Sequence, residues 1–325
     1  IYAKNRGDGA LEITTTGTTK GTNDSGIVAK NSAASTSLTI NAATTTGYRY
    51  GIYAINRGDG ALEITTTGTT TGANYDGINA NNSAAGTSLK ITAEDTTGTQ
   101  GIKAKNSGTG ALEITTTGTT EGISSNGINA NNSAAGTSLT ITAKATTGRQ
   151  GIYAMNRGTG ALEITTSGTT KGTSYYGIYA NNSAAGTSLK ITAEDTAGRQ
   201  GIRALNNGTG GLEITTSGTT KGTSYYGIYA FMSNTASTGD LTINAANTEG
   251  GTNGIYAGNR GTGALSITTS GAITGGTGYG IRTITAANKT TTITLNSGAV
   301  SSTAGLGIFN NGGNSTTTVN TGASV

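Results

Sequence analysis

The sequence predicts an all-β protein, a right-handed parallel β-helix (solenoid) of about thirteen coils with about 25 residues in each. Three observations predict this fold. A unit repeats along the whole chain, apolar residues alternate within each unit, and Gly, Asn and Ser separate the alternating segments. Hydrophobic residues make up 33% of the chain and only two are Phe, so they can fill a narrow core but not a wide globular one.

The repeat is clearest in residues 151–200, which consist of two similar halves. Each half opens with Gly-Ile-x-Ala, passes an Asn and reaches Leu-x-Ile. A few aliphatic side chains per unit cannot offset the entropy of ordering that unit, so stacking of successive coils has to stabilise the fold. Gly-Ile pairs mark the units at positions 26, 51, 77, 101, 127, 151, 177, 201, 227, 254, 280 and 307.

Each unit contains three predicted strands. In the first, Ile152 and Ala154 alternate with polar residues, and a period of two places them on one face. In the second, Leu162 and Ile164 alternate in the same way. The Thr-rich segment that follows favours a third strand, because Thr suits strands and Thr-Thr-x-Gly runs form helices poorly.

Two rows of polar residues are expected if successive units stack in register. The residue between Leu and Ile has alternating charge, as at Glu163, Lys190 and Glu213, and opposite charges on neighbouring strands attract. An Asn lies five residues after the first Gly of most units, and its amide is predicted to hydrogen-bond along the stack. These residues are Asn5, Asn31, Asn56, Asn82, Asn106, Asn132, Asn156, Asn182 and Asn206, with a break at Met232 and a return at Asn259.

The domain organisation follows from where the repeat weakens. Residues 1–279 are predicted to form regular coils, and residues 280–325 are predicted to form degenerate C-terminal coils of the same solenoid. Gly280-Ile281-Arg282-Thr283 lacks the Asn, and Ile293-Thr294-Leu295 replaces Leu-x-Ile. The chain opens in the middle of a unit, so we expect a fragment of a longer protein.

Composition excludes several classes of function. The chain has no Cys and no His, which argues against zinc sites, thiol nucleophiles and imidazole bases, and we expect no cofactor or metal. A net charge of +4, with Lys and Arg scattered, is not typical of nucleic-acid binding. No apolar run is long enough to predict membrane insertion. We also expect a monomer.

The carboxylates raise the alternative of a polysaccharide-active enzyme, because such enzymes also occur among β-helices. The residues Glu63, Glu113, Glu163 and Glu213 are predicted to lie two coils apart on an outer face. Lys residues lie between them and no aromatic platform flanks them, whereas a glycosidase needs a carboxyl pair in a cleft. A solvated charge row is therefore favoured, and an enzyme is the distant alternative.

Basic residues and tyrosines gather near the corner where each new coil begins. Such residues are typical of protein interfaces, so we predict a contact surface for a protein or a sulfated glycan, although solvent-exposed turns also carry them. The candidate receptor-binding residues are Arg49, Lys103, Arg149, Arg199, Arg203, Tyr175, Tyr176, Tyr225 and Tyr226.

An alternative contact is offered by two Arg-Gly-Asp tripeptides of the type that integrins bind. They lie in the turn after the Asn, and other units have Ser-Gly-Thr or Arg-Gly-Thr there, so the Gly also has a backbone role. This alternative predicts an integrin- or matrix-binding adhesin. Its residues are Arg6, Gly7, Asp8, Arg57, Gly58 and Asp59.

The alternation of GIYAxNRGxGALEITTxGTTxG with GIxANNSAAGTSLxITA resembles the passenger domains of Bartonella autotransporters, particularly the angiogenic-factor group called BafA, over essentially the whole chain. The resemblance implies a secreted β-helical virulence factor that reaches the bacterial surface by type V secretion. It also implies a non-enzymatic growth-factor mimic that binds a vascular endothelial growth factor receptor on host cells. The family offers no catalytic or receptor-contacting residues to carry over to this sequence.

Overall fold

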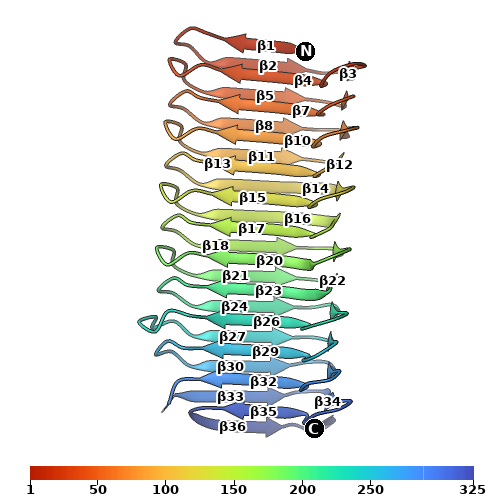
Figure 1. Cartoon of the computed structure of the whole chain (residues 1–325), viewed down its shortest axis with the longest axis vertical. Helices are drawn as coiled ribbons and strands as arrows, with labels where there is room; N and C mark the ends of the chain where they lie inside the picture. The colour runs from red at the N-terminus through yellow and green to blue at the C-terminus, as the bar shows by residue number, and fades with distance from the viewer. Residues whose placement is uncertain (288) are drawn as a thin grey trace. The chain divides into compact units, whose positions relative to one another are not determined.

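The structure is a computed structural model that describes residues 1–287 and 289–325. It confirms the predicted fold class: the chain is an all-β parallel solenoid of about 12 turns with roughly 26 residues per turn. No helix occurs within those two ranges. Each regular turn contributes one strand to each of three ladders, which we call the Gly-Ile, Leu-Ile and Thr ladders (Figure 1). The chain divides into two compact units, Ile1–Ala161 (unit 1) and Leu162–Val325 (unit 2).

In unit 1 the three ladders follow the three predicted strands of each repeat. The Gly-Ile ladder contains β1 (Tyr2–Asn5), β4 (Ile27–Asn31), β7 (Ile52–Asn56), β10 (Ile78–Asn82), β13 (Ile102–Asn106), β15 (Ile128–Asn132) and β17 (Ile152–Asn156). The Leu-Ile ladder contains β2 (Leu11–Thr15), β5 (Leu38–Ala42), β8 (Leu62–Thr66), β11 (Leu89–Ala93) and the first parts of β14 (Leu112–Gly122) and β16 (Leu139–Gly148). The Thr ladder contains β3 (Thr19–Gly21), β6 (Thr45–Gly47), β9 (Thr70–Gly72), β12 (Thr96–Gly98) and the last parts of β14 and β16.

Unit 2 has the same three ladders. The Gly-Ile ladder contains β20 (Tyr176–Asn182), β23 (Gln200–Asn206), β26 (Ile228–Met232), β29 (Ile255–Asn259), β32 (Ile281–Thr285) and β35 (Ile308–Asn311). The Leu-Ile ladder contains β18 (Leu162–Thr166), β21 (Leu189–Ala193), β24 (Leu212–Thr216), β27 (Leu241–Ala245), β30 (Leu265–Thr269), β33 (Thr290–Leu295) and β36 (Asn314–Val319). The Thr ladder contains β19 (Thr170–Gly172), β22 (Thr196–Gly198), β25 (Thr220–Gly222), β28 (Thr248–Gly250), β31 (Ile273–Gly275), β34 (Gly298–Ser302) and β37 (Ala323–Ser324).

Strand pairing is parallel, and it keeps equivalent residues of successive repeats opposite each other. Ile78 pairs with Ile52 on one side and Ile102 on the other. The inward-facing residues are fully buried, as at Ile78, Leu89 and Ile91, each 0% exposed. A core one or two aliphatic side chains wide therefore runs through each unit, and the alternate residues of every strand face outward.

The predicted charge row is confirmed on the Leu-Ile ladder of unit 2. Glu163 is the register partner of Lys190, and Lys190 is the register partner of Glu213. The Nζ of Lys190 lies 3.6 Å from a carboxylate oxygen of Glu213. Residues far apart in the sequence thus form a straight outer row.

The predicted Asn row is also confirmed in unit 1. The Nδ2 of Asn82 donates to Oδ1 of Asn106 at 3.0 Å, and that of Asn106 donates to Oδ1 of Asn132 at 3.1 Å. Oδ1 of Asn106 also accepts the N–H of Gly108 at 3.2 Å, which closes the turn. In unit 2, Asn182 donates to Asn206 at 3.1 Å, and the row is interrupted where Met232 is buried instead.

The predicted degenerate coils continue the ladders of unit 2. β32 pairs with β29 and β35, and β33 pairs with β30 and β36. Thr285 occupies the Asn position, and its hydroxyl lies 3.3 Å from that of Thr291. All six residues of β36 are exposed, so this strand contributes no buried side chain to the core.

Candidate functional site

The outer face of the Gly-Ile ladder in unit 2 carries a row of aromatic and Arg side chains. In the Gly-Ile-x-Ala segments the residue after the Ile points outward, because the Ile and Ala on either side are buried. In-register pairing places these outward residues directly above one another. The row consists of Tyr179, Arg203, Tyr229, Tyr256, Arg282 and Phe309.

Aromatic residues at the corners and on the strands widen this row into a surface. We call the whole set the aromatic strip. It comprises the row together with Tyr176, Tyr226, Phe231, Arg260 and Tyr279, and Arg199 and Tyr225 lie at its edge.

The centre of the aromatic strip is a cluster of three tyrosines. Tyr229 and Tyr256 stack with ring centroids 5.0 Å apart, and the Tyr226 ring lies 5.2 Å from Tyr229 and 5.5 Å from Tyr256. These distances fall in the range where aromatic pairs attract beyond simple area burial. Burial raises the pKa of Tyr229 above its ordinary value of 10.0, and Tyr256 adds to the rise while Arg203 opposes it. Its hydroxyl therefore stays protonated to a higher pH than that of a free tyrosine.

Two Arg side chains of the row lie across these rings. The guanidinium of Arg203 is 5.0 Å from the Tyr229 centroid and 5.9 Å from that of Tyr176. The guanidinium of Arg282 is 5.3 Å from the Tyr256 ring. The buried Nε atoms of Arg203 and Arg282 have no hydrogen-bond partner among the described residues. Ring contacts rather than ion pairs hold these two cations.

Phe231 and Arg260 extend the aromatic strip toward the Asn row. Phe231 on β26 faces Gly258 on β29, and a Cβ at Gly258 would meet the Phe231 ring. The absent side chain thus lets the ring lie flat on the neighbouring strand. The guanidinium of Arg260 lies 5.1 Å from the Phe231 centroid, which adds a third cation.

Arg side chains and carboxylates lie on different faces of unit 2. Each of its four Arg side chains lies over at least one aromatic ring, and these are Arg199, Arg203, Arg260 and Arg282. None of its side-chain carboxylates lies on the Gly-Ile ladder. They are Glu163 on β18, Glu213 on β24, Glu249 on β28, Glu194 and Asp195 between β21 and β22, and Asp240 directly before β27.

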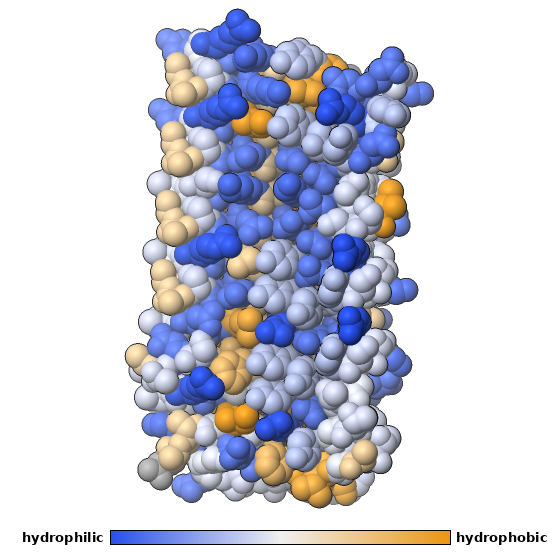
Figure 2. All heavy atoms as spheres, viewed as in Figure 1, coloured by the Kyte–Doolittle hydropathy of each residue, from blue (hydrophilic) through white to orange (hydrophobic). Residues whose placement is uncertain are grey.

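Figure 2 shows the face that carries the Gly-Ile ladders. Blue and pale groups cover most of this face, and the orange hydrophobic groups are few. A mixed surface of this kind suits a contact with a soluble partner better than burial in a lipid phase.

Six of the predicted receptor-binding residues come together at the aromatic strip or its edge. Tyr176 contacts Arg203. Arg199 lies over the Tyr225 ring at 5.3 Å, and its Nη2 donates to the Tyr225 hydroxyl at 3.4 Å. Tyr175 lines a small hollow with Tyr176, Arg199 and Tyr225. Tyr226 belongs to the central tyrosine cluster.

The other predicted receptor-binding residues lie in unit 1, on different turns. Arg49 lies over the Tyr75 ring at 5.4 Å. Lys103 is exposed on β13 between Asn79 and Asn129, so it contacts no ring of its own row. Arg149 is exposed in the turn that follows β16. These three residues do not form a single cluster.

Several strip residues were not among the predicted candidates. Most of the ring contacts involve Tyr229, Tyr256, Arg282 and Phe309. The tyrosines among the predicted candidates are instead the pairs at 175–176 and 225–226. The signal that finds them is the residue that follows each Gly-Ile pair, compared from one repeat to the next.

The Arg-Gly-Asp turn at residues 57–59 is held firmly in place. The N–H of Gly58 donates to Oδ1 of Asn56 at 3.2 Å, and a Cβ at Gly58 would clash with the Ser35 carbonyl. Arg57 and Asp59 are exposed on either side of this buried Gly. The tripeptide Arg6, Gly7 and Asp8 is exposed throughout. The Gly of the second copy thus has the backbone role expected from the repeat.

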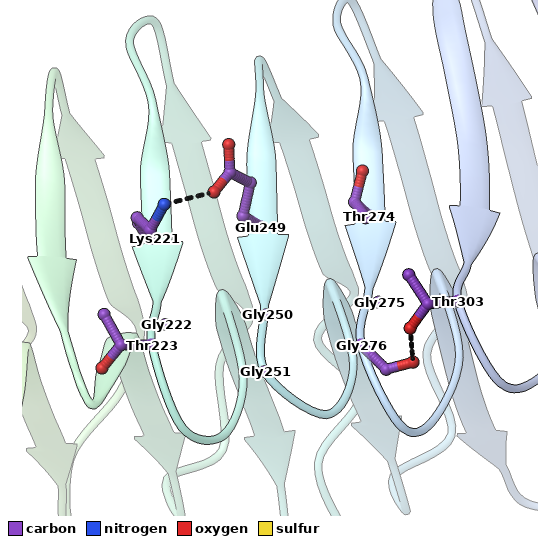
Figure 3. Close-up of a pocket in the computed structure, with 10 residues that line it drawn as sticks. All are labelled: Lys221, Gly222, Thr223, Glu249, Gly250, Gly251, Thr274, Gly275, Gly276 and Thr303. Carbon is purple, nitrogen blue, oxygen red and sulfur yellow. Dashed lines mark hydrogen bonds and ion pairs between the residues drawn. The ribbon is translucent and has the colours of Figure 1, made fainter.

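A polar hollow of about 320 Å³ lies on the Thr ladder of unit 2 (Figure 3). Lys221 and Glu249 form an ion pair of 2.7 Å at its rim, and Thr303 Oγ1 donates to the Gly276 carbonyl at 2.7 Å. Its charges neutralise each other and no aromatic ring lines it. It is a weaker candidate than the aromatic strip.

No group of three or more Asp, Glu, His or Cys side chains able to hold a metal occurs within residues 1–287 and 289–325. In that part of the chain there is likewise no helix long and apolar enough to cross a membrane. Comparison with known proteins found no matching family model, no matching curated protein and no matching solved structure.

Proposed function

We propose that this chain is a non-enzymatic binding protein whose aromatic strip contacts a host cell-surface receptor protein. One observation carries the proposal: every Arg of unit 2 lies over an aromatic ring on one face, and the side-chain carboxylates lie elsewhere. Tyr and Arg dominate the residues on which protein–protein affinity depends.

The rigidity of the surface supports the same function. The strip residues project from hydrogen-bonded parallel strands, and Tyr229, Tyr256 and Arg282 already contact their neighbours. Binding then orders few side chains, which lowers the entropic cost of association. Because the strip is positively charged, its partner should present an acidic surface.

The sequence resemblance supplies the expected setting for this contact. It favours a secreted autotransporter passenger, displayed on or released from the bacterial surface, that binds an endothelial receptor of the vascular endothelial growth factor type and promotes angiogenic signalling. The polysaccharide-enzyme alternative finds little support, because Lys190 lies between Glu163 and Glu213 and pairs with the latter.

The proposal is tested by binding of this chain to immobilised ectodomains of endothelial growth factor receptors. We expect saturable binding that weakens as salt rises, since screening reduces attraction between charged surfaces. Absence of binding at micromolar concentration would contradict the proposal.

The exposed Arg57 and Asp59 keep the adhesin alternative testable. The double substitution Asp8→Glu with Asp59→Glu should leave receptor binding unchanged if the aromatic strip is the contact. Loss of cell adhesion in that variant would favour an integrin-binding function instead.

A further inference from the structure

Unit 1 has a hollow on the outer face of its Gly-Ile ladder. Parallel pairing places Tyr2 opposite Val28, and Val28 opposite Tyr53, in one outward row. Val28 is much shorter than the tyrosines on either side and is only 6% exposed. A space of about 360 Å³ therefore opens above Val28 between the two rings. This size suits one ring-shaped group better than an extended chain.

Lys30 brings a positive charge to one side of this hollow. Its Nζ lies 5.4 Å from the Tyr53 centroid and 6.0 Å from the Tyr2 centroid. Lys4, the register partner of Lys30 on β1, is also a cation. Among the described residues no carboxylate lies within ion-pair distance of Lys30. An anionic group in the hollow would supply the missing counter-charge.

The opposite side of the hollow offers both donors and acceptors. Asp24 and Arg49 approach to 4.0 Å there, with both side chains more than half exposed. Tyr50 stacks on Tyr53 at 4.9 Å. The Tyr50 hydroxyl can donate a hydrogen bond, and burial, followed by the charge of Asp76, raises its pKa further above neutral pH. A ligand with several hydroxyl groups would find partners on this side.

We propose that this hollow binds an acidic sugar, such as a hexuronate or a sulfated hexose. The tyrosine rings suit the apolar face of a sugar ring, Lys30 suits its acid group, and Asp24 with Arg49 suits its hydroxyls. A free inorganic anion would use Lys30 or Arg49 but not the rings, and a neutral sugar would leave Lys30 unpaired. The site lies in unit 1 and does not rest on the proposed receptor contact, which involves unit 2.

The test is a calorimetric titration of the whole chain with three probes: glucuronate, glucose and inorganic sulfate. We expect glucuronate to bind more tightly than either of the others, and Lys30→Met to weaken its binding roughly tenfold or more. Lys20→Met, an exposed substitution on β3, is the matched control and should leave binding unchanged. Absence of glucuronate binding, equal binding of glucose or sulfate, or equal effects of the two Lys variants would overturn the proposal.

A second variant tests the gap above Val28 without removing a charge. Val28→Tyr fills the space with a side chain that this row already carries at Tyr2 and Tyr53, so the strand should fold normally. We expect glucuronate binding to be lost while the circular dichroism spectrum and the melting temperature are retained. Unaltered glucuronate binding by a folded Val28→Tyr variant would show that the sugar does not occupy this hollow.

Discussion

Tyr229 and Tyr256 lie face to face on neighbouring strands, with ring centroids 5.0 Å apart and ring planes at 5° to each other. The backbone spacing of paired strands, about 4.8 Å, sets this distance. Any residue type kept at one outward position of the repeat is therefore brought to stacking distance along the unit. The solenoid turns a sequence repeat into a preformed aromatic surface, and the Arg residues of the same row are held on that surface.

The raised pKa of Tyr229 predicts a loss of stability at alkaline pH. In the unfolded chain the phenol ionises near its ordinary pKa of 10.0, whereas burial raises the folded-state pKa. Its contribution to stability is therefore complete below about pH 10 and is lost as the pH rises through the folded-state pKa. Urea unfolding at neutral and alkaline pH should show a smaller alkaline loss for Tyr229→Phe than for the wild type. Tyr225→Phe, at an exposed corner, is the control; equal effects of both variants would contradict the assignment.

The Asn row should contribute strongly to stability. Asn106 is 0% exposed. Its Nδ2 donates a hydrogen bond to Asn132, and its Oδ1 accepts hydrogen bonds from Asn82 and Gly108. Asn106→Ala leaves buried partners unsatisfied, so we expect it to reduce the free energy of unfolding by about 2–4 kcal/mol. Asn81→Ala, on the outer face of β10, should cost less than about 0.5 kcal/mol in the same urea titration. Similar losses of unfolding free energy in both variants would contradict the stabilising role of the Asn row.

The outer charge row should contribute little to the stability of the fold. The side chains of Lys190 and Glu213 are 47% and 45% exposed, so water and salt screen their attraction. We expect Glu213→Gln to reduce the free energy of unfolding by less than about 1 kcal/mol, and added salt to abolish the difference. A loss of several kcal/mol that persists in high salt would mean that the row supports the fold directly.

Gly258 should be needed for the position of Phe231. A Cβ at this site would meet the ring, so Gly258→Ala should displace Phe231 and lower stability by about 1–3 kcal/mol. The same substitution in a Phe231→Ala background should cost much less, because the clash is then absent. A double-mutant cycle of unfolding free energies measures this coupling, and simple additivity would refute the contact.

The sequence predicted strands and register well because both follow from the repeat. Glu163 and Lys190 were expected to be neighbours from their equivalent positions alone, and they are. The aromatic strip was predicted only in part, since its contacts depend on side-chain rotamers that repeat spacing does not specify. Tyr176 reaches Arg203 and Arg282 reaches Tyr256 through such rotamers. Arg49, Lys103 and Arg149 were grouped with them by composition, although they lie on separate turns of unit 1.

The most direct test of the central proposal is the affinity of endothelial receptor ectodomain for strip variants. Arg203→Gln combined with Arg282→Gln removes two ring-bound cations and should weaken binding roughly tenfold or more. The control pair Lys171→Gln and Lys221→Gln removes the same charge from β19 and β25 on the Thr ladder and should change the affinity by less than about twofold. Equal affinity of the wild type and the strip variant would contradict the proposal that this face is the receptor contact.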